Sequence, residues 1–213
     1  KTRELEKLSG KRFGDPKDPL LVSVRSGAPF SMPGMMDTIL NLGMSDKTAE
    51  DLATITGDPR FAYDTYRRFL QLFGKIVLKV PGEEFEKVIE EAKEKAGVKT
   101  DIEVPAASWK EVCQRFKAMI KERSGKEVPQ EPMEQLFMSV AAVFDSWYNP
   151  RAQEYRKIYK ISEELGTAVS IVLMVYGNMD DRSATGVAFT RNPSTGENKI
   201  YGEYLVKAQG EDV

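Results

Sequence analysis

The sequence predicts an α+β fold. Short apolar runs bounded by glycine and proline occur toward both ends of the chain, which is typical of strands. A long middle stretch instead repeats its apolar residues at helical spacing. With 213 residues, the chain is long enough to bury a core as one large domain or two small ones.

The first 44 residues are predicted to hold a helix end, a loop, a strand and a short helix. Residues 1–11 space their leucines as in a helix that Gly10 ends, and residues 14–19 carry the prolines and aspartates of a loop. The apolar run 20–24 predicts a strand, and residues 36–41 predict a short helix.

The stretch from about residue 45 to residue 130 has helical periodicity. Ser45 and Thr48 are N-cap candidates, and Glu50 is placed for a capping box. We expect further helices over residues 59–73, around residues 85–92 and after an N-cap at Ser108, with a short extended run over residues 76–80. The charges of this stretch are expected to form a solvated face.

The remainder of the chain predicts helices followed by strands. A long helix is expected over residues 131–147, and Pro150 is placed to start the next one. The apolar run 167–176 predicts a strand buried on both faces, followed by a polar loop and two strands over residues 186–190 and 200–207. The side chains expected to point inward from the long helix are Met133, Leu136, Phe137, Val140, Val143 and Phe144.

Composition excludes several classes of function. The net charge of −2 gives no electrostatic case for nucleic acid or an acidic membrane, and no apolar run approaches the roughly 20 residues of a membrane span. One cysteine, Cys113, excludes an intrachain disulfide, suits a reducing compartment and is expected to be a buried small residue. The N-terminus is charged throughout and shows no signal peptide, so we expect a cytoplasmic protein.

The chain contains no histidine, which excludes a histidine base, a phosphohistidine or a histidine-ligated metal.

Residues 23–43 are the most informative stretch. A strand delivers Arg25 into a loop that carries three glycines and two prolines. Arginine presents a fork of donors to phosphate oxygens, and glycine lets backbone N–H groups approach them. The spacing fits neither a P-loop nor a dinucleotide-binding motif. A structural turn with a surface arginine is the alternative.

Several motifs resemble one known family. The stretch 23–43, Ser-Val-Arg-Ser-Gly-Ala-Pro-Phe-Ser-Met-Pro-Gly-Met-Met-Asp-Thr-Ile-Leu-Asn-Leu-Gly, is similar to a signature of the pyruvate, phosphate dikinase family. Related phosphoenolpyruvate synthases and glucan dikinases share the Val-Arg-Ser core and lack the Met-Pro-Gly-Met-Met-Asp continuation. Further blocks agree in order and spacing, so that the resemblance spans nearly the whole chain: residues 61–69, 144–152, 185–197, 201–204 and 208–213.

The resemblance implies an incomplete ATP-grasp-like nucleotide-binding domain, in which two α+β lobes hold ATP between them. The first lobe would be discontinuous, comprising residues 1–44 and 130–176. An all-helical inserted subdomain would occupy residues 45–129. Residues 177–213 would begin the second lobe.

The resemblance also implies an activity. The family interconverts ATP, pyruvate and phosphate with AMP, phosphoenolpyruvate and diphosphate, using Mg²⁺, and passes the β-phosphoryl group of ATP to a phosphohistidine on a separate swivelling domain. Because this chain has no histidine, we expect that domain to be absent and the chain alone to be inactive. The Mg²⁺ ligands are expected outside this chain, and the complete enzyme is expected to be a homo-oligomer. The alternatives are a non-catalytic nucleotide-binding or interaction module and a phosphoenolpyruvate synthase-like relative.

Specific residues follow from the resemblance. Arg25 would clamp the ATP phosphates, with a surface salt bridge as its alternative. The residues implied around the nucleotide are Met36, which is equally well explained as core filler, the hinge residues Met174, Val175 and Tyr176, and the cover-loop residues Thr185 and Gly186. The residues implied to contact phosphate or the phosphohistidine domain, with local ion pairs as the alternative for the arginines, are Arg68, Arg151, Arg191 and Ser194.

The sequence departs from the family pattern at two places. Val172 stands where family members usually carry glutamine, which removes one polar contact in the cleft. Pro29 and Phe30 stand where Arg-Ala is expected, which removes one positive charge beside the phosphate loop.

Overall fold

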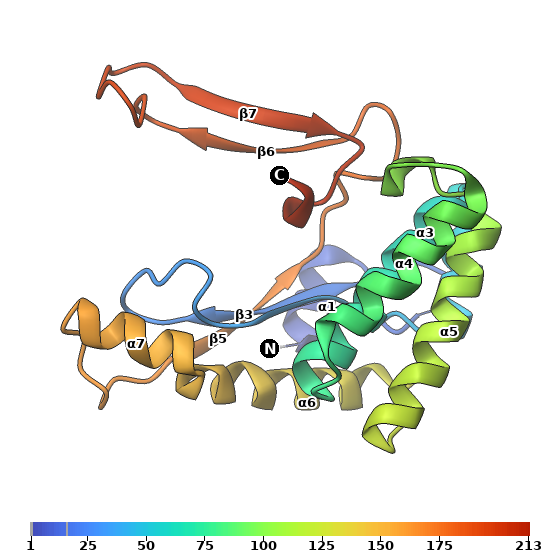
Figure 1. Cartoon of the computed structure of the whole chain (residues 1–213), viewed down its shortest axis with the longest axis horizontal. Helices are drawn as coiled ribbons and strands as arrows, with labels where there is room; N and C mark the ends of the chain where they lie inside the picture. The colour runs from blue at the N-terminus through green and yellow to red at the C-terminus, as the bar shows by residue number, and fades with distance from the viewer. Residues whose placement is uncertain (1, 16) are drawn as a thin grey trace. The chain divides into compact units, whose positions relative to one another are not determined.

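The computed structural model describes residues 2–15 and 17–213, so the expectations for Lys1 and Pro16 lie outside the described residues. The chain divides into two compact units, the first ending at Met174 and the second comprising Val175–Val213. The second unit is the orange-to-red part of the chain in Figure 1. The interpretation of these parts as ATP-grasp lobes stays a prediction.

The first unit is built on a three-stranded antiparallel sheet. Strand β3 (Val22–Gly27) lies in the centre, between β4 (Thr38–Leu42) and β5 (Ala168–Leu173). Helix α6 (Pro132–Asp145) packs against all three strands (Figure 1). The cross-strand pair of Val24 and Ile39 is fully buried, which places the core on one side of β3.

The short helix predicted over residues 36–41 is wrong, because this segment forms β4. Its side chains Ile39 and Leu42 are fully buried against neighbours from distant parts of the chain. A run of five residues has no local signal strong enough to override that pairing. The predicted N-terminal helix is confirmed as α1 (Thr2–Ser9), followed by Gly10 at a φ of 73°. Two-residue strands β1 (Arg12–Phe13) and β2 (Pro19–Leu20) pair in parallel.

The predicted helices of the middle region are confirmed, with errors at their ends. They are α2 (Asp46–Thr56), α3 (Pro59–Leu72), α4 (Gly82–Ala96) and α5 (Ala106–Ser124). Ser45 caps α2 by accepting from the Thr48 amide. Glu50 is too far along the helix for the capping box, since N3 is Thr48, and Ser108 lies inside α5 behind an N-cap at Pro105.

The extended run predicted over residues 76–80 is wrong, because a π-helical turn, η1 (Phe73–Val77), continues α3. A Cβ at Gly74 would lie 2.6 Å from the Phe85 ring and 2.9 Å from Ile120. The missing side chain therefore lets the turn lie directly on α4 and α5. A short 3₁₀ turn, η2 (Asp101–Glu103), leads into the last helix of the region.

Helix α6 is confirmed, but only one side of it is covered. Leu136 and Val143 are buried, whereas Met133, Phe137 and Phe144 are exposed, Phe137 by 68 %. The prediction that these three point inward is wrong because a helix lying on one face of a sheet buries a single stripe. A 3₁₀ turn, η3 (Ser146–Tyr148), then leads into α7 (Pro150–Ile158), whose start at Pro150 is confirmed.

The strand predicted over residues 167–176 is confirmed as β5, but it is not buried on both faces. It lies at the edge of the sheet, and Val172 is 44 % exposed. A continuous apolar run therefore overstates burial when the strand has a neighbour on only one side.

The second unit is an antiparallel hairpin. Strands β6 (Ala184–Phe189) and β7 (Tyr201–Val206) pair in register from Ala184–Val206 to Phe189–Tyr201, which confirms the two predicted strands. In the connecting turn, the Asn192 amide donates to the Glu197 carbonyl. The chain closes with a 3₁₀ turn, η4 (Gly210–Asp212).

Candidate functional site

Arg25 lies within strand β3 rather than in the loop predicted for it. Its Cα pairs with Thr38 on one side and with Ser170 on the other. Because side chains alternate along a strand, Ser23, Arg25, Thr38 and Ser170 share one face of the sheet, opposite Val24. We call these four residues the polar face.

The Arg25 guanidinium is exposed and has a neutral partner. Its Nε donates to the Ser23 hydroxyl oxygen at 3.1 Å, and the buried Ser23 hydroxyl donates in turn to the Val172 carbonyl at 3.4 Å. Within the described residues, no carboxylate forms an ion pair with Arg25, so the salt bridge proposed as its alternative role is not found. A positive fork on the same face of the sheet as Thr38 and Ser170 suits a phosphate or carboxylate ligand.

The loop from residue 28 to residue 37 joins β3 to β4 beside the polar face. It turns at Gly34, with a φ of 70°, and the Met35 amide donates to the Met32 carbonyl at 3.1 Å. Met36 is half-buried in this loop. Asp37, its last residue, is bound by Asn149 and Arg151.

Two of the arginines predicted to contact phosphate or a partner domain form local ion pairs. Arg151 pairs with Asp37 and donates from its Nε to the Met35 carbonyl at 2.9 Å. Arg68, 6 % exposed, pairs with Asp64 at 3.2 Å. These are the local ion pairs that the sequence left open, so their contact with a ligand stays a prediction.

The other predicted residues divide between the two units. The Met174 amide donates to the Leu21 carbonyl at 2.9 Å, which continues the sheet beyond β5, whereas Val175 is 82 % exposed. Tyr176 is half-buried in the second unit. Their arrangement around one nucleotide stays a prediction.

Thr185 lies in strand β6 rather than in the polar loop predicted before the strand, and Gly186, predicted as the first residue of the strand 186–190, lies inside β6. Gly186 faces Tyr204 across the hairpin, and a Cβ there would lie 2.5 Å from the Glu203 carbonyl oxygen. Its missing side chain therefore serves strand pairing. Thr185 pairs with Leu205.

The loop before β6 is held by Asp180. This carboxylate accepts hydrogen bonds from the Arg182 side chain and amide and from the Ser183 hydroxyl, which lower its pKa. Farther along, Arg191 donates to the Gly196 carbonyl and the Ser194 amide donates to the Asn192 side chain, so both form local contacts in the connection between β6 and β7.

Three further observations limit the chemistry of the chain. Nowhere in the described part of the chain do three histidine, cysteine, aspartate or glutamate side chains gather as a metal site would require. Cys113 is buried, as predicted, and burial raises the pKa of its thiol, so it is a poor nucleophile. Within residues 2–15 and 17–213, no helix combines the length and apolar character that crossing a membrane requires.

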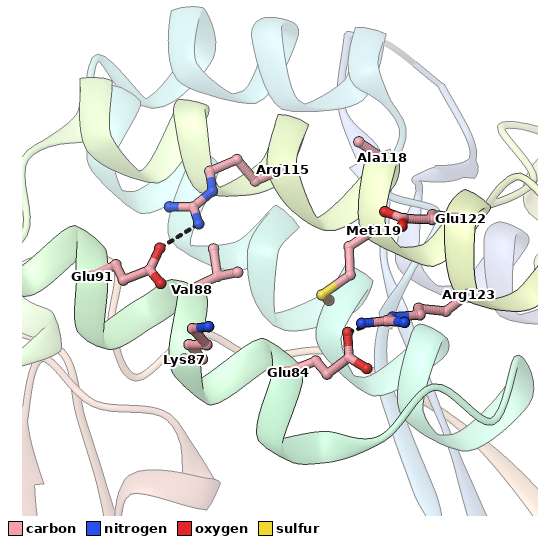
Figure 2. A pocket seen from close by; sticks show the side chains of 9 residues that line it. All are labelled: Glu84, Lys87, Val88, Glu91, Arg115, Ala118, Met119, Glu122 and Arg123. Atoms are coloured by element: carbon pink, nitrogen blue, oxygen red, sulfur yellow. Dashed lines mark hydrogen bonds and ion pairs between the residues drawn. The ribbon is translucent and has the colours of Figure 1, made fainter.

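A groove of about 510 Å³ runs between α4 and α5 (Figure 2). Its rim carries two ion pairs that cross between the helices, Arg115 with Glu91 at 2.5 Å and Arg123 with Glu84 at 2.8 Å. None of the predicted site residues lines it. Because the arginines of the groove are already paired with glutamates, the groove is a weaker candidate for binding an anion than the polar face.

The contact of Asp37 with Asn149 was missed by sequence reasoning, whereas a local ion pair was one of the roles considered for Arg151. Asn149 precedes the proline that was predicted to start a helix and was given no role of its own, whereas its amide group binds the Asp37 carboxylate. Asp37 itself lies inside the stretch 23–43 but was given no role. The only available signal was a carboxylate in a turn-rich loop, and the loop's anchor lies 112 residues away in sequence.

Comparison with known proteins identifies one family. The family model described as "Pyruvate phosphate dikinase, AMP/ATP-binding domain" matches residues 2–213. Pyruvate, phosphate dikinase of Clostridium symbiosum is 59 % identical over 210 residues, covering 98 % of this chain and 24 % of that protein. The Entamoeba histolytica enzyme is 56 % identical over 211 residues, covering 98 % and 24 %, and the chloroplastic Arabidopsis thaliana enzyme 1 is 54 % identical over 209 residues, covering 98 % and 22 %. The chain therefore spans about a quarter of the length of the curated relatives it matches.

Proposed function

This chain belongs to the pyruvate phosphate dikinase AMP/ATP-binding domain family, and we propose that it is the ATP-binding portion of a pyruvate, phosphate dikinase. The proposed whole reaction converts ATP, pyruvate and phosphate to AMP, phosphoenolpyruvate and diphosphate, and it is reversible. The part played by this chain is to hold ATP while the β-phosphoryl group passes to a histidine on another domain of the same enzyme.

The observation that carries the proposal is the exposed Arg25 guanidinium on the polar face, flanked by Thr38 and Ser170. Phosphoryl transfer from ATP spreads negative charge over the phosphate oxygens, so positioning and charge neutralisation are the main tasks of the binding domain. A guanidinium held within a strand supplies both, because the sheet restrains its backbone.

The other family-implied roles remain proposals. Met36 lies in the loop beside the polar face, and we propose that it packs against the adenine base. Thr185 and Gly186 lie in strand β6, and we propose that this strand contacts ATP. Met174, Val175 and Tyr176 would supply the adenine hinge. The residues proposed to contact phosphate or the domain that carries the histidine are Arg68, Arg151, Arg191 and Ser194.

Mg²⁺ takes part in the proposed reaction, but the described residues show no cluster that would hold it, so no step is assigned to it here. The complete enzyme is proposed to be a homo-oligomer. A cytoplasmic location is proposed from the single cysteine, although the relatives include chloroplastic enzymes.

Substitution of Arg25 in the complete enzyme tests the proposal. We expect Arg25→Ala to slow the half-reaction that releases AMP from ATP by on the order of 10², because a charge-assisted contact to phosphate is lost. The half-reaction between pyruvate and the phosphorylated histidine should keep its rate. Rapid-quench assays of the two half-reactions measure both rates.

Arg12→Ala is the matched control, since Arg12 is an exposed arginine on strand β1 and lies outside the polar face. It should leave both half-reactions unchanged. Equal loss in both half-reactions of Arg25→Ala would indicate a folding defect, and unchanged ATP chemistry would contradict the proposed role of the polar face.

A further inference from the structure

The loop 28–37 has ten residues, longer than the two to five typical of a hairpin connection. Five of its residues are exposed, and its backbone makes few hydrogen bonds of its own. Such a loop is mobile unless other elements hold it. Tyr155 donates to the Ser31 carbonyl at 3.4 Å and Arg151 to the Met35 carbonyl at 2.9 Å. The end of the loop at Asp37 is held by more contacts than either of these.

Asp37 is fixed at its backbone and at both carboxylate oxygens. Its amide donates to the Ser146 hydroxyl at 3.1 Å, Asn149 Nδ2 donates to its Oδ2 at 3.0 Å, and Arg151 Nη2 donates to its Oδ1. Ser146 donates its own proton to the Val143 carbonyl at 2.7 Å, so its lone pair is directed at Asp37. The loop end is therefore bound to η3 and to the start of α7.

Asn149 is specialised for this contact. It occupies the N-cap position of α7, where an asparagine side chain normally accepts from a backbone amide of the first helical turn. Here its side chain makes no capping hydrogen bond, and its amide donates to Asp37 instead. The helix thus lacks a side-chain cap while the loop gains an anchor.

The Asp37 side chain is only 12 % exposed, whereas that of Arg151 is 52 % exposed. A partly buried carboxylate that accepts two hydrogen bonds, one of them charge-assisted, is held more firmly than a surface ion pair. Replacing Asp37 with asparagine removes the charge but keeps the shape of the side chain, so it loosens the anchor and leaves the buried apolar pair of Val24 and Ile39 in place.

The anchor is adjacent to the polar face. Asp37 directly precedes Thr38, whose Cα pairs with Arg25, and directly follows Met36. Fixing Asp37 therefore fixes the place where β4 begins and the position of Thr38 opposite Arg25. It also fixes the approach of the loop to the same ligand.

We propose that Asp37 is a positioning residue for nucleotide binding: held by Asn149 and Arg151, it sets the β3–β4 loop against the polar face on which Arg25 lies. This inference rests on the proposed function of that face. Asp37 acts through the residues beside it and does not itself touch the phosphates, which it would repel.

Asp37→Asn in the complete enzyme tests the proposal, because it keeps the shape of the side chain and removes the charge that Arg151 pairs with. We expect the ATP half-reaction to lose about tenfold or more in kcat/KM, mostly through KM, because the loop no longer holds the ligand pose. The pyruvate half-reaction and the melting temperature should stay close to those of the parent enzyme. Asp18→Asn is the matched control, since Asp18 is an exposed aspartate paired with Lys11 at 2.5 Å.

Asn149→Ala provides the second arm. If Asp37 and Asn149 act through one contact, their double substitution should cost no more than the larger single one. An Asp37→Asn enzyme that matches Asp18→Asn in the ATP half-reaction would overturn the proposal. So would equal loss in both half-reactions with a lowered melting temperature, which indicates a merely structural role. Failure of the polar face itself is recognised separately, as unchanged ATP chemistry in Arg25→Ala.

Discussion

The helical region and the polar face of the sheet differ in how they use arginine. In α3, Arg67 and Arg68 share the buried Asp64, and Arg67 also reaches Asp101 at 2.7 Å and lies 4.4 Å from the centre of the Trp109 ring. On the polar face, the partner of Arg25 is a neutral hydroxyl. An arginine whose charge is matched inside the fold contributes to stability, whereas one without a counter-charge remains available for a ligand.

The largest stability effect is expected at Asp64, which tests the structural half of this comparison. Asp64→Ala should lower the free energy of unfolding by about 3–5 kcal/mol, because it leaves two buried guanidinium groups without their shared carboxylate. Urea denaturation measures this value, with Asp18→Ala as an exposed control expected to change it by less than about 0.5 kcal/mol. A loss at Asp64 as small as the control's would show that this network does not stabilise the fold.

A smaller effect is expected at Gly74, where the helical region is closely packed. Gly74→Ala should cost about 1–3 kcal/mol, because its Cβ would overlap Phe85 and Ile120. Gly210→Ala is the control, because a Cβ at this position meets open space, and it should lower the free energy of unfolding by less. Gly97 is unsuitable as a control because its φ is positive. Thermal unfolding of both variants measures the difference, and equal midpoints would argue against close packing at η1.

The smallest effect is expected in the groove between α4 and α5, whose ion pairs are exposed. The hydrogen bond from Arg115 lowers the pKa of Glu91, so this pair contributes stability above the unfolded-state pKa of the carboxyl and loses it as the pH falls. Arg115→Gln should return the pKa of Glu91 toward its ordinary value. An NMR titration of the Glu91 side chain measures this, and an unchanged pKa would mean that the ion pair is not populated in solution.

The sequence was sufficient for features that are local. The helices α3, α4 and α7 were predicted because their starts and ends carry caps, prolines and glycines, as at Pro59, Gly97 and Pro150. The hairpin of the second unit was predicted because its strands and turn are adjacent in sequence.

Features that depend on distant partners were not predictable. Strand β4 looked helical over residues 36–41 because its partner strand lies across a ten-residue loop, and the exposed side of α6 depends on how much of the helix the sheet covers. At the site, Arg25 was proposed as an anion ligand from its motif, and that role stays a prediction. Its position within a strand follows from β5, which pairs with it from 145 residues away at Ser170. The role of Asp37 depends on Asn149 in the same way.

We propose that Arg25, whose partner in the fold is a neutral hydroxyl, binds the phosphates of ATP. The most direct test compares the affinities of the complete enzyme for ATP and for adenosine, measured by calorimetry in the parent and in Arg25→Ala. We expect the substitution to weaken ATP binding by about tenfold or more and to leave adenosine binding unchanged, since adenosine carries no phosphate. Equal weakening of both ligands, or no change in either, would contradict it.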